Sequence, residues 1–361
     1  MTKMEKIIGT STTSGGEQIR DWQGSHSASS TRQAIPQVHI SFQEQQALRA
    51  GLASLSVTDS LSGIRHMPAL GQLLESALCS EKIDRLRNFP KAPEEAMIVR
   101  GLPLDSRLPA TPYDMAPGIE QLPVVAGAIL AVLQTLHTHP VAYEGENDDT
   151  VFRHVSPKRQ CEAEKSSYGS RMDLCMHVDN PHLPLTCEPV SALSACPEYL
   201  CLTGLRCELD VPTRIVAISE VLAMLPAWVE TALSQPQFDI RRPVSFGKPG
   251  NVLEQVTMLY KSATGELFCR YNKASVTATG AIANLALQLF EAAANHPDVV
   301  RPVLLPAGHM LIIKNQKTQQ NKKGITPRYD GRDRWLLRVF GVNDPARVLA
   351  LDPQQPFIAR A

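Results

Sequence analysis

The stretch Pro-Arg-Tyr-Asp-Gly-Arg-Asp-Arg-Trp-Leu-Leu-Arg, residues 327–338, is the most distinctive part of the chain. It joins a turn-forming Pro-Arg-Tyr-Asp-Gly run to an apolar segment, residues 334–340, that is typical of a β-strand. Other short apolar segments bounded by turn residues predict further strands. They cover residues 96–104, 150–155, 199–206, 252–260, 267–271 and 310–314.

Helices are predicted both before and among these strands. Ser41-Phe-Gln-Glu44 fits the S-x-x-E capping box and predicts the start of a helix. Apolar side chains three and four residues apart predict a second helix over residues 69–87, and residues 124–137 and 281–294 predict two more. Helices first, then many strands with a late helix among them, predict an α+β protein built on an antiparallel sandwich or barrel.

The N-terminal segment has a different composition from the rest. Residues 9–31 are rich in Ser, Thr and Gly and offer little to bury, so residues 1–35 are expected to form a disordered tail. The remaining sequence contains no internal repeat and no linker. Residues 36–361 are therefore expected to form one domain.

The bulk composition excludes several classes of function. The 361 residues include 36 basic and 36 acidic side chains and 43% apolar residues, which is enough for a sizeable core. Zero formal charge argues against nucleic-acid binding, and no segment has the roughly 20 apolar residues that cross a bilayer. Without a secretory signal or a CxxC pair, a cytoplasmic protein with unpaired thiols is expected. A small-molecule enzyme or a binding protein remains.

A candidate metal site lies at His177-Val178-Asp179. Alternate residues of a strand face the same side, so a His and an Asp two positions apart are able to share one metal ion. With a distant second histidine, such a pair forms the facial triad of non-heme Fe(II) oxygenases. The other H-x-D in the chain, His296-Pro297-Asp298, follows a predicted helix, and its proline indicates a capping turn instead.

Three groups of segments carry a resemblance to a known family. They are residues 100–103 (Arg-Gly-Leu-Pro), residues 167–181 with 199–206 and 211–213, and residues 306–315 with the Pro-Arg-Tyr-Asp-Gly stretch. Together they resemble the iron(II)/2-oxoglutarate-dependent dioxygenases of the clavaminate synthase-like and taurine dioxygenase-like branch, which includes amino-acid hydroxylases. The resemblance implies a double-stranded β-helix (jelly-roll) core flanked by helices.

The resemblance also implies a cofactor and a set of site residues. His177 and Asp179 would bind Fe(II), which would react with O2 and the co-substrate 2-oxoglutarate. Arg334 would bind the distal carboxylate of 2-oxoglutarate, because its planar fork forms two hydrogen bonds to a carboxylate. Thr213 would add a hydroxyl contact.

Arg338 lies four residues after Arg334 on the same predicted strand. The two side chains therefore face the same side, and Arg338 is expected to reach the substrate carboxylate. The alternative for Arg334 is a surface ion pair with Asp330 or Asp333.

One ligand of the family pattern is missing. Aligned without gaps from Asn315 to Pro327, the chain has Gln320 where the family carries its distal histidine. An amide oxygen is a weaker donor for Fe(II) than an imidazole. Three alternatives remain open: Gln320 is a substitute ligand, the metal has only two protein ligands, or oxygenase chemistry is lost and the cavity only binds. The last histidine, His309, opens a strand instead, and the presence of Asp179 argues against halogenation.

The substrate end also departs from the family. Hydroxylases of arginine and lysine often have acidic residues just after an R-Y or R-F step, whereas Asn272 follows Arg270-Tyr271 here. A cationic substrate side chain is therefore less expected, and Asn272 and Ser170 are candidate substrate contacts. The acidic run 144–149 is expected to be a solvated loop, with a cover over the site as the alternative.

These observations lead to one hypothesis and one alternative. The hypothesis is an enzyme that hydroxylates a C–H bond of an amino acid or amino-acid-derived metabolite, with no nucleic-acid or membrane partner. The alternative is a non-catalytic or altered-metal binding protein that keeps the oxygenase fold.

Overall fold

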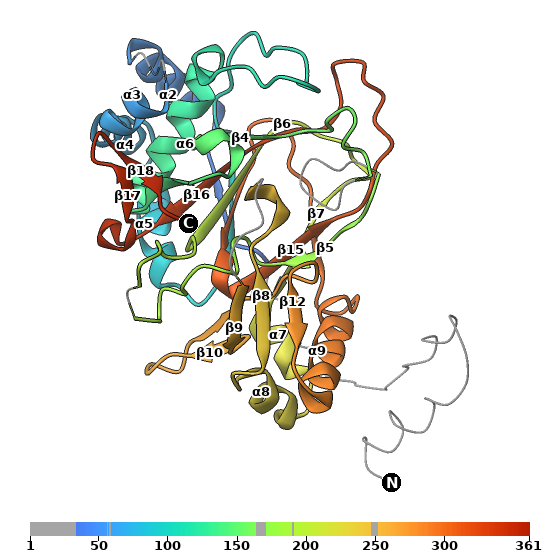
Figure 1. Ribbon diagram of the computed structural model, residues 1–361. Helices are drawn as coiled ribbons and strands as arrows, with labels where there is room; N and C mark the ends of the chain where they lie inside the picture. The colour runs from blue at the N-terminus through green and yellow to red at the C-terminus, as the bar shows by residue number, and fades with distance from the viewer. Residues whose placement is uncertain (1–33, 56, 58, 164–170, 190, 247–251) are drawn as a thin grey trace. The chain divides into compact units, whose positions relative to one another are not determined.

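Two main sheets, and helices packed against the larger one, make up most of the fold (Figure 1). The structure is a computed structural model that describes residues 34–361 except 56, 58, 164–170, 190 and 247–251. Ile35–Ala361 forms one compact unit. The tail predicted over residues 1–35 lies almost entirely outside the described residues and remains a prediction.

The larger sheet has nine strands, and β16 runs through its centre. It is mainly antiparallel, with β6 on one side of β16 and β3 and β4 on the other. In spatial order its strands are β1 (Gln37–His39), β2 (Ala96–Arg100), β14 (Met310–Lys314), β6 (Tyr199–Arg206), β16 (Trp335–Val342), β3 (His139–Tyr143), β18 (Gln355–Ala359) and β17 (Ala350–Asp352), with β4 (Arg153–Val155) also on β16.

The smaller sheets come from residues 174–322. A four-stranded sheet has the order β13 (Arg301–Val303), β7 (Thr213–Ala217), β15 (Thr318–Lys322) and β5 (Leu174–His177). A three-stranded sheet has the order β12 (Val276–Ala278), β8 (Phe238–Arg241) and β9 (Val252–Val256), and β10 (Leu259–Lys261) pairs with β11 (Leu267–Cys269).

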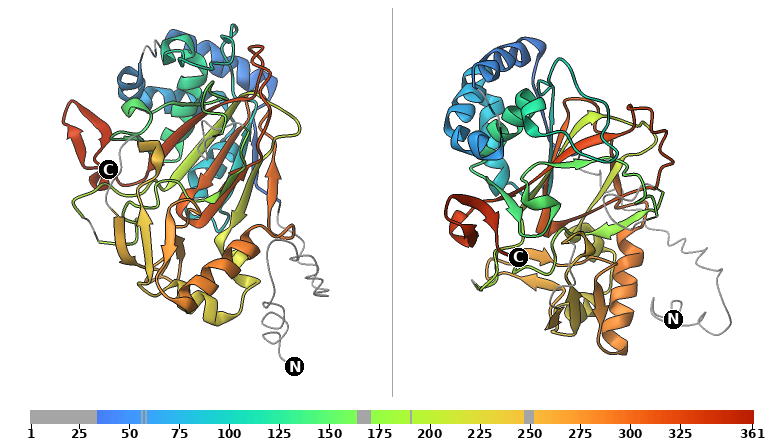
Figure 2. Two further views of the ribbon diagram at one scale, coloured as in Figure 1. Left: turned by 45° about the vertical axis from the view of Figure 1, so that its right-hand side comes forward. Right: turned by 45° about the horizontal axis from the view of Figure 1, so that its top comes forward.

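The helices form two groups, which Figure 2 shows at opposite ends of the sheets. The first group packs on the larger sheet and consists of α2 (Phe42–Ser54), α3 (Ser60–Arg65), α4 (Met67–Ala77), α5 (Ser80–Asn88) and α6 (Pro123–Thr135). The second group packs on the three-stranded sheet and consists of α7 (Ile218–Ala223), α8 (Ala227–Leu233) and α9 (Ala281–Ala294). Short 3-10 helices are η1 (Phe89–Lys91), η2 (Ile119–Gln121), η3 (Asn147–Asp149), η4 (Val244–Phe246), η5 (Asn315–Lys317) and η6 (Pro345–Arg347).

The pleat of β16 divides the apolar side chains between two cores. Trp335, Leu337 and Val339 pack with the first group of helices. Leu336 and Phe340 point to the other face and pack with residues of β7 and β13 from the four-stranded sheet. Because successive side chains of a strand alternate, the even-numbered residues of β16 face the space between the two sheets.

Several predicted elements are confirmed. β6, β14 and α9 have the bounds that the sequence predicted. The capping box at the start of α2 is formed: Glu44 N–H donates to Ser41 Oγ at 3.3 Å, and Ser41 N–H donates to Glu44 Oε2 at 2.7 Å. The α+β prediction from the sequence is therefore confirmed in its coarser form: the protein combines helices with sheets.

Two predicted elements were each divided in two. The helix over residues 69–87 is two helices, α4 and α5, because Leu78 (φ −107°, ψ 153°) and Cys79 (φ −68°, ψ 154°) have extended backbones. The apolar spacing continues across this break, so periodicity did not reveal it. The strand over residues 252–260 is likewise two strands, β9 and β10, in different sheets. β7, β13 and β15 were not predicted.

The helix layer gives a direct test of the packing. Leu70 of α4 is fully buried in the core beneath the larger sheet. Leu70→Ala is expected to lower the free energy of unfolding by about 2–5 kcal/mol, because a cavity adds to the lost transfer energy. Urea denaturation measures the change. Leu209→Ala, at a side chain that is 75% exposed, is the control and should change stability by less than about 0.5 kcal/mol.

Candidate functional site

The predicted metal-binding residues lie at the end of β5 and on its neighbour β15. β5 ends at His177, Asp179 follows two residues later, and Gln320 of β15 is the register partner of His177. His177 Nε2 lies 3.9 Å from Asp179 Oδ1. Gln320 Nε2 donates to Asp179 Oδ2 at 2.5 Å. The three residues are therefore neighbours in space.

Neighbouring groups hold His177 and Asp179 in place. The carbonyl oxygen of Cys175 lies 2.8 Å from His177 Nδ1, so the tautomer that donates from Nδ1 keeps the Nε2 lone pair for a ligand. Asp179 N–H donates to Asn315 Oδ1 at 3.0 Å, and Asn315 Nδ2 donates to the Asp179 carbonyl at 3.1 Å. These bonds fix the backbone on both sides of the Asp179 carboxylate.

The donor set offers one imidazole, one carboxylate and one amide. Over the described ranges, no three His, Cys, Asp or Glu side chains lie close enough together to hold a metal ion. Nitrogen and oxygen donors suit Fe(II), and His177 and Asp179 fit it directly. An amide NH2 has no lone pair for a metal, but a half-turn of the Gln320 amide exchanges its nitrogen and oxygen. Gln320 therefore fits Fe(II) as a third ligand after one rotation of its side-chain amide.

Arg334 is a buried cation that forms no ion pair among the described residues. It lies just before β16, is 6% exposed, and donates from Nη2 to Thr213 Oγ1 of β7 at 3.0 Å. No carboxylate forms an ion pair with it in the part of the chain that the structure describes. Burial lowers its pKa to about 10. Burial also lowers the pKa of nearby Lys322 to about 8, and the Arg334 charge adds to this shift. This environment favours a bound anion.

The Pro-Arg-Tyr-Asp-Gly turn positions Arg334. The Asp333 carboxylate accepts the backbone N–H groups of Arg328 at 2.9 Å and Tyr329 at 2.8 Å, and the Tyr113 hydroxyl at 2.8 Å. Gly331 has φ +81°, a conformation that favours glycine. Asp333 thus organises the turn, and the alternative ion pair between Arg334 and Asp333 or Asp330 is not formed.

A buried charge network continues from the metal-binding residues to β16. Arg338 Nη1 lies 3.7 Å from Asp179 Oδ1, and Arg338 Nη2 lies 2.6 Å from Glu146 Oε1. Arg153 of β4, the register partner of Arg338, binds the same Glu146 oxygen at 3.0 Å. Two cations side by side on neighbouring strands repel each other, and the shared carboxylate offsets this.

Glu146 corrects the expectation of a solvated acidic loop. The segment 144–149 does contain exposed Asp148 on η3. Glu146, however, is 3% exposed and belongs to the charge network. The sequence contains no local signal for this, because both cationic partners come from strands remote in the chain.

The remaining predicted residues have different locations. Asn272 forms an isolated β-bridge with His177, and its Oδ1 accepts the Ala274 N–H at 2.9 Å. Ser170 lies outside the described residues. His309 lies before β14, where burial lowers its pKa, and none of its contacts in the described structure reach the metal-binding residues. His296 and Asp298 lie in the turn after α9, as predicted.

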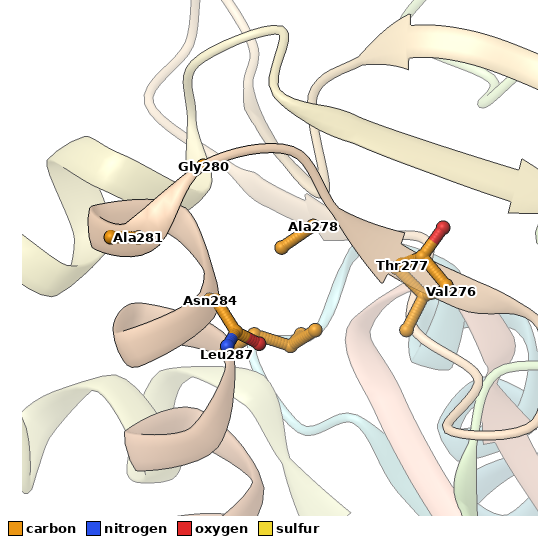
Figure 3. Close-up of a pocket in the computed structure, with 7 residues that line it drawn as sticks. All are labelled: Val276, Thr277, Ala278, Gly280, Ala281, Asn284 and Leu287. Atoms are coloured by element: carbon orange, nitrogen blue, oxygen red, sulfur yellow. The ribbon is translucent and has the colours of Figure 1, made fainter.

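A hollow between β12 and α9 is separate from these residues (Figure 3). Its only polar side chains are Thr277 and Asn284. None of the predicted site residues lines it. It therefore adds nothing to the candidate site.

The resemblance seen in the sequence is confirmed: over most of its length the chain is similar to amino-acid oxygenases, and its fold matches solved non-heme iron oxygenases. No family model matches the chain. It is 27% identical to L-asparagine oxygenase from Streptomyces coelicolor, over 74% of this chain and 77% of the relative. It is 24% identical to L-lysine 3-hydroxylase from Catenulispora acidiphila, over 82% of this chain and 81% of the relative.

Solved structures show the same fold. Asparagine oxygenase in complex with Fe(II), 2S,3S-3-hydroxyasparagine and succinate matches with a TM-score of 0.77 at 23% identity, over 90% of this chain and 99% of that one. The non-heme iron oxygenase OrfP in complex with Fe, succinate and (3S)-hydroxy-L-Arg matches with a TM-score of 0.74 at 20% identity, over 90% and 100%. Among the described helices, none has the length and apolar character needed to cross a membrane.

The buried network makes a stability prediction. Glu146→Gln removes the negative charge that Arg153 and Arg338 share, and it should lower the free energy of unfolding by about 3–5 kcal/mol. Urea denaturation at neutral pH measures the effect. Glu144→Gln is the matched control, because no ion pair of Glu144 is present in the described structure. If both substitutions lowered the free energy of unfolding by the same small amount, the proposed stabilising role of the network would be wrong.

Proposed function

We propose that the protein is an Fe(II)/2-oxoglutarate-dependent oxygenase that hydroxylates a C–H bond of an amino acid or an amino-acid-derived metabolite. The observation that carries the proposal is the pair His177 and Asp179 in the same protein as a buried arginine, Arg334, for which the described residues supply no counter-ion. We further propose that the two main sheets are the halves of a double-stranded β-helix. The names of the relatives support the proposal, and a cytoplasmic location remains a prediction from the sequence.

In the proposed site, His177, Asp179 and Gln320 hold the metal. His177 contributes Nε2, Asp179 contributes a carboxylate oxygen, and Gln320 contributes Oε1 after its amide has turned. When bound, Fe(II) with 2-oxoglutarate supplies the activation of O2. Asn315 keeps the Asp179 carboxylate oriented through its two backbone hydrogen bonds.

Arg334 and Thr213 bind the distal carboxylate of 2-oxoglutarate in this proposal. The guanidinium offers a planar pair of N–H donors, and the Thr213 hydroxyl is already hydrogen-bonded to it at 3.0 Å. An incoming carboxylate would neutralise a cation whose pKa burial has lowered to about 10. Binding of the co-substrate thus recovers part of the cost of burying Arg334.

Arg338 and Glu146 are suited to the two charged groups of an amino acid. Arg338 would bind the substrate carboxylate, and Glu146 would accept hydrogen bonds from its ammonium group. The two side chains already share a 2.6 Å contact, so their charges are oriented before the substrate arrives. Asn272 and Ser170 remain candidate substrate contacts.

A second candidate function rests on Gln320. Its amide nitrogen donates to Asp179, an arrangement that a binding protein without oxygenase chemistry would tolerate. The deciding experiment measures succinate formed from 2-oxoglutarate with Fe(II) and O2, with and without a panel of free L-amino acids. Amino-acid-dependent succinate together with a hydroxylated product supports the oxygenase. Binding of 2-oxoglutarate without any turnover supports the binding protein.

The metal-binding role of Gln320 makes a separate prediction. Gln320→His is expected to tighten Co(II) binding by roughly tenfold or more, because imidazole is the stronger donor, and Gln320→Ala is expected to weaken it. Isothermal titration calorimetry without 2-oxoglutarate measures both effects. Asn321→Ala, at the neighbouring position of β15 with its side chain on the other face, is the control. Wild-type affinity in Gln320→Ala would rule out Gln320 as a ligand.

The co-substrate site makes a prediction at Arg334. Arg334→Lys keeps a charge but loses the planar pair of donors, so it should raise the Kd of 2-oxoglutarate by more than about tenfold in the presence of Mn(II). Arg332→Lys, at an exposed position two residues earlier, should leave the Kd unchanged. Equal Kd values for wild type and Arg334→Lys would place the co-substrate elsewhere.

A further inference from the structure

Three polar side chains beside the proposed site keep buried nitrogen atoms without hydrogen-bond partners. Asn180 and His182, just after Asp179, are 3% and 4% exposed. Among the described residues, no hydrogen-bond partner is found for Asn180 Nδ2, for either ring nitrogen of His182 or for Arg242 Nε. Unpaired buried donors are costly and infrequent in folded proteins. A ligand that supplied hydrogen-bond acceptors to these three side chains would therefore stabilise this region.

A series of contacts links Arg242 and His182 to the charge network. Arg338 contacts both Asp179 and Glu146. Gly145, next to Glu146, lies close to Arg242. A Cβ atom added to Gly145 would lie 3.4 Å from Arg242 Nη2.

The series then returns to the metal-binding segment. The Arg242 guanidinium lies 4.6 Å from the centre of the Phe246 ring. The Phe246 ring in turn packs edge-on against His182, with 4.8 Å between ring centres. Arg242 and Phe246 both lie in the segment that follows β8, and Phe246 is the last residue of η4. The series therefore places Arg242 and His182 close to the segment that carries Asp179.

The charges in this region are unequal. Arg153 and Arg338 share Glu146, and Arg270 is paired with Glu188. Arg242 has no carboxylate within ion-pair distance in the described ranges, and its Nη2 donates to the Glu144 carbonyl at 3.0 Å. His182 stays neutral because burial lowers its pKa to about 3, with Arg242 adding to the shift. The region therefore holds one uncompensated positive charge.

Asn180, His182 and Arg242 all offer hydrogen-bond donors. The Asn180 amide offers an NH2 group, a neutral His182 offers one N–H, and Arg242 offers its guanidinium. Asn272, on the segment that pairs with His177, carries no negative charge for a cationic ligand. Oxygen acceptors complement such a set, whereas an ammonium or guanidinium group would be repelled by Arg242.

We propose that Arg242, with Asn180 and His182, selects a substrate amino acid whose side chain ends in a carboxylate or a carboxamide. This inference rests on the proposed function, because it assumes that Arg338 and Glu146 bind the amino-acid end of the same substrate. The side-chain oxygens would accept hydrogen bonds from Arg242 and from the two buried donors. Lysine and arginine are excluded by charge.

The test measures binding separately from turnover. Protein loaded with Mn(II) and 2-oxoglutarate is titrated under anaerobic conditions with L-aspartate, L-asparagine, L-glutamate and L-glutamine, and with L-lysine and L-arginine. At least one of the first four should bind more than about tenfold tighter than either cationic amino acid. Comparison of acid with amide distinguishes a carboxylate from a carboxamide ligand.

Variants at Arg242 test whether this side chain selects the substrate. Arg242→Ala should weaken binding of the preferred ligand by more than about tenfold, and Arg242→Lys should recover part of the lost affinity. Arg241→Ala, at the exposed neighbouring position on β8, is the matched control and should leave the affinity unchanged. Thermal denaturation of each variant verifies that it folds.

Three results would overturn the inference. They are tighter binding of lysine or arginine, an unchanged affinity in Arg242→Ala, and no binding of any of the four acceptor amino acids. Metal-dependent binding of 2-oxoglutarate reports on the proposed function independently. If 2-oxoglutarate binds while one of these three results is found, the substrate class is wrong and the oxygenase proposal stands.

Discussion

The register of β16 is the constraint on which the rest of the structure depends. Its odd-numbered side chains fill the core under the helices, and its even-numbered side chains face the four-stranded sheet. A shift of one residue would move Trp335 into the space between the sheets and Arg338 into the helix core. Hydrophobic burial on the helix side thus fixes the position of the charged residue on the other side. The site is held in place by a core that shares no side chain with it.

The net charge of the chain is zero, but the site contains strong local charges. Glu146 lies between Arg153 and Arg338 from different strands, and Asp179 contacts Arg338. Arg334 and Arg242 remain without carboxylate partners in the described structure. Such cations are costly to bury unless a ligand shares the site. One of them is assigned here to the co-substrate and the other to the substrate side chain. In the proposed enzyme, the unequal distribution of charge therefore separates two anion-binding regions around the proposed metal site.

The sequence predicted local features well and long-range ones poorly. The capping box at Ser41 and the strands β6 and β14 depend on neighbouring residues, and they were predicted correctly. The break between α4 and α5 was missed because apolar spacing continues through Leu78. The burial of Glu146 was missed because Arg153 and Arg338 reach it from β4 and β16.

For the site, the sequence by itself determined which groups are available: one His-x-Asp pair, a glutamine in place of a histidine, and arginines on a strand with a two-residue alternation. Only the tertiary structure decided how they meet. It paired Gln320 with His177, directed the amide nitrogen toward Asp179, left Arg334 without a counter-ion, and joined Arg242 to His182 through Phe246. The physical reason is that hydrogen bonding and desolvation act over a few ångströms in space. The residues that supply them here are separated by tens to hundreds of positions along the chain.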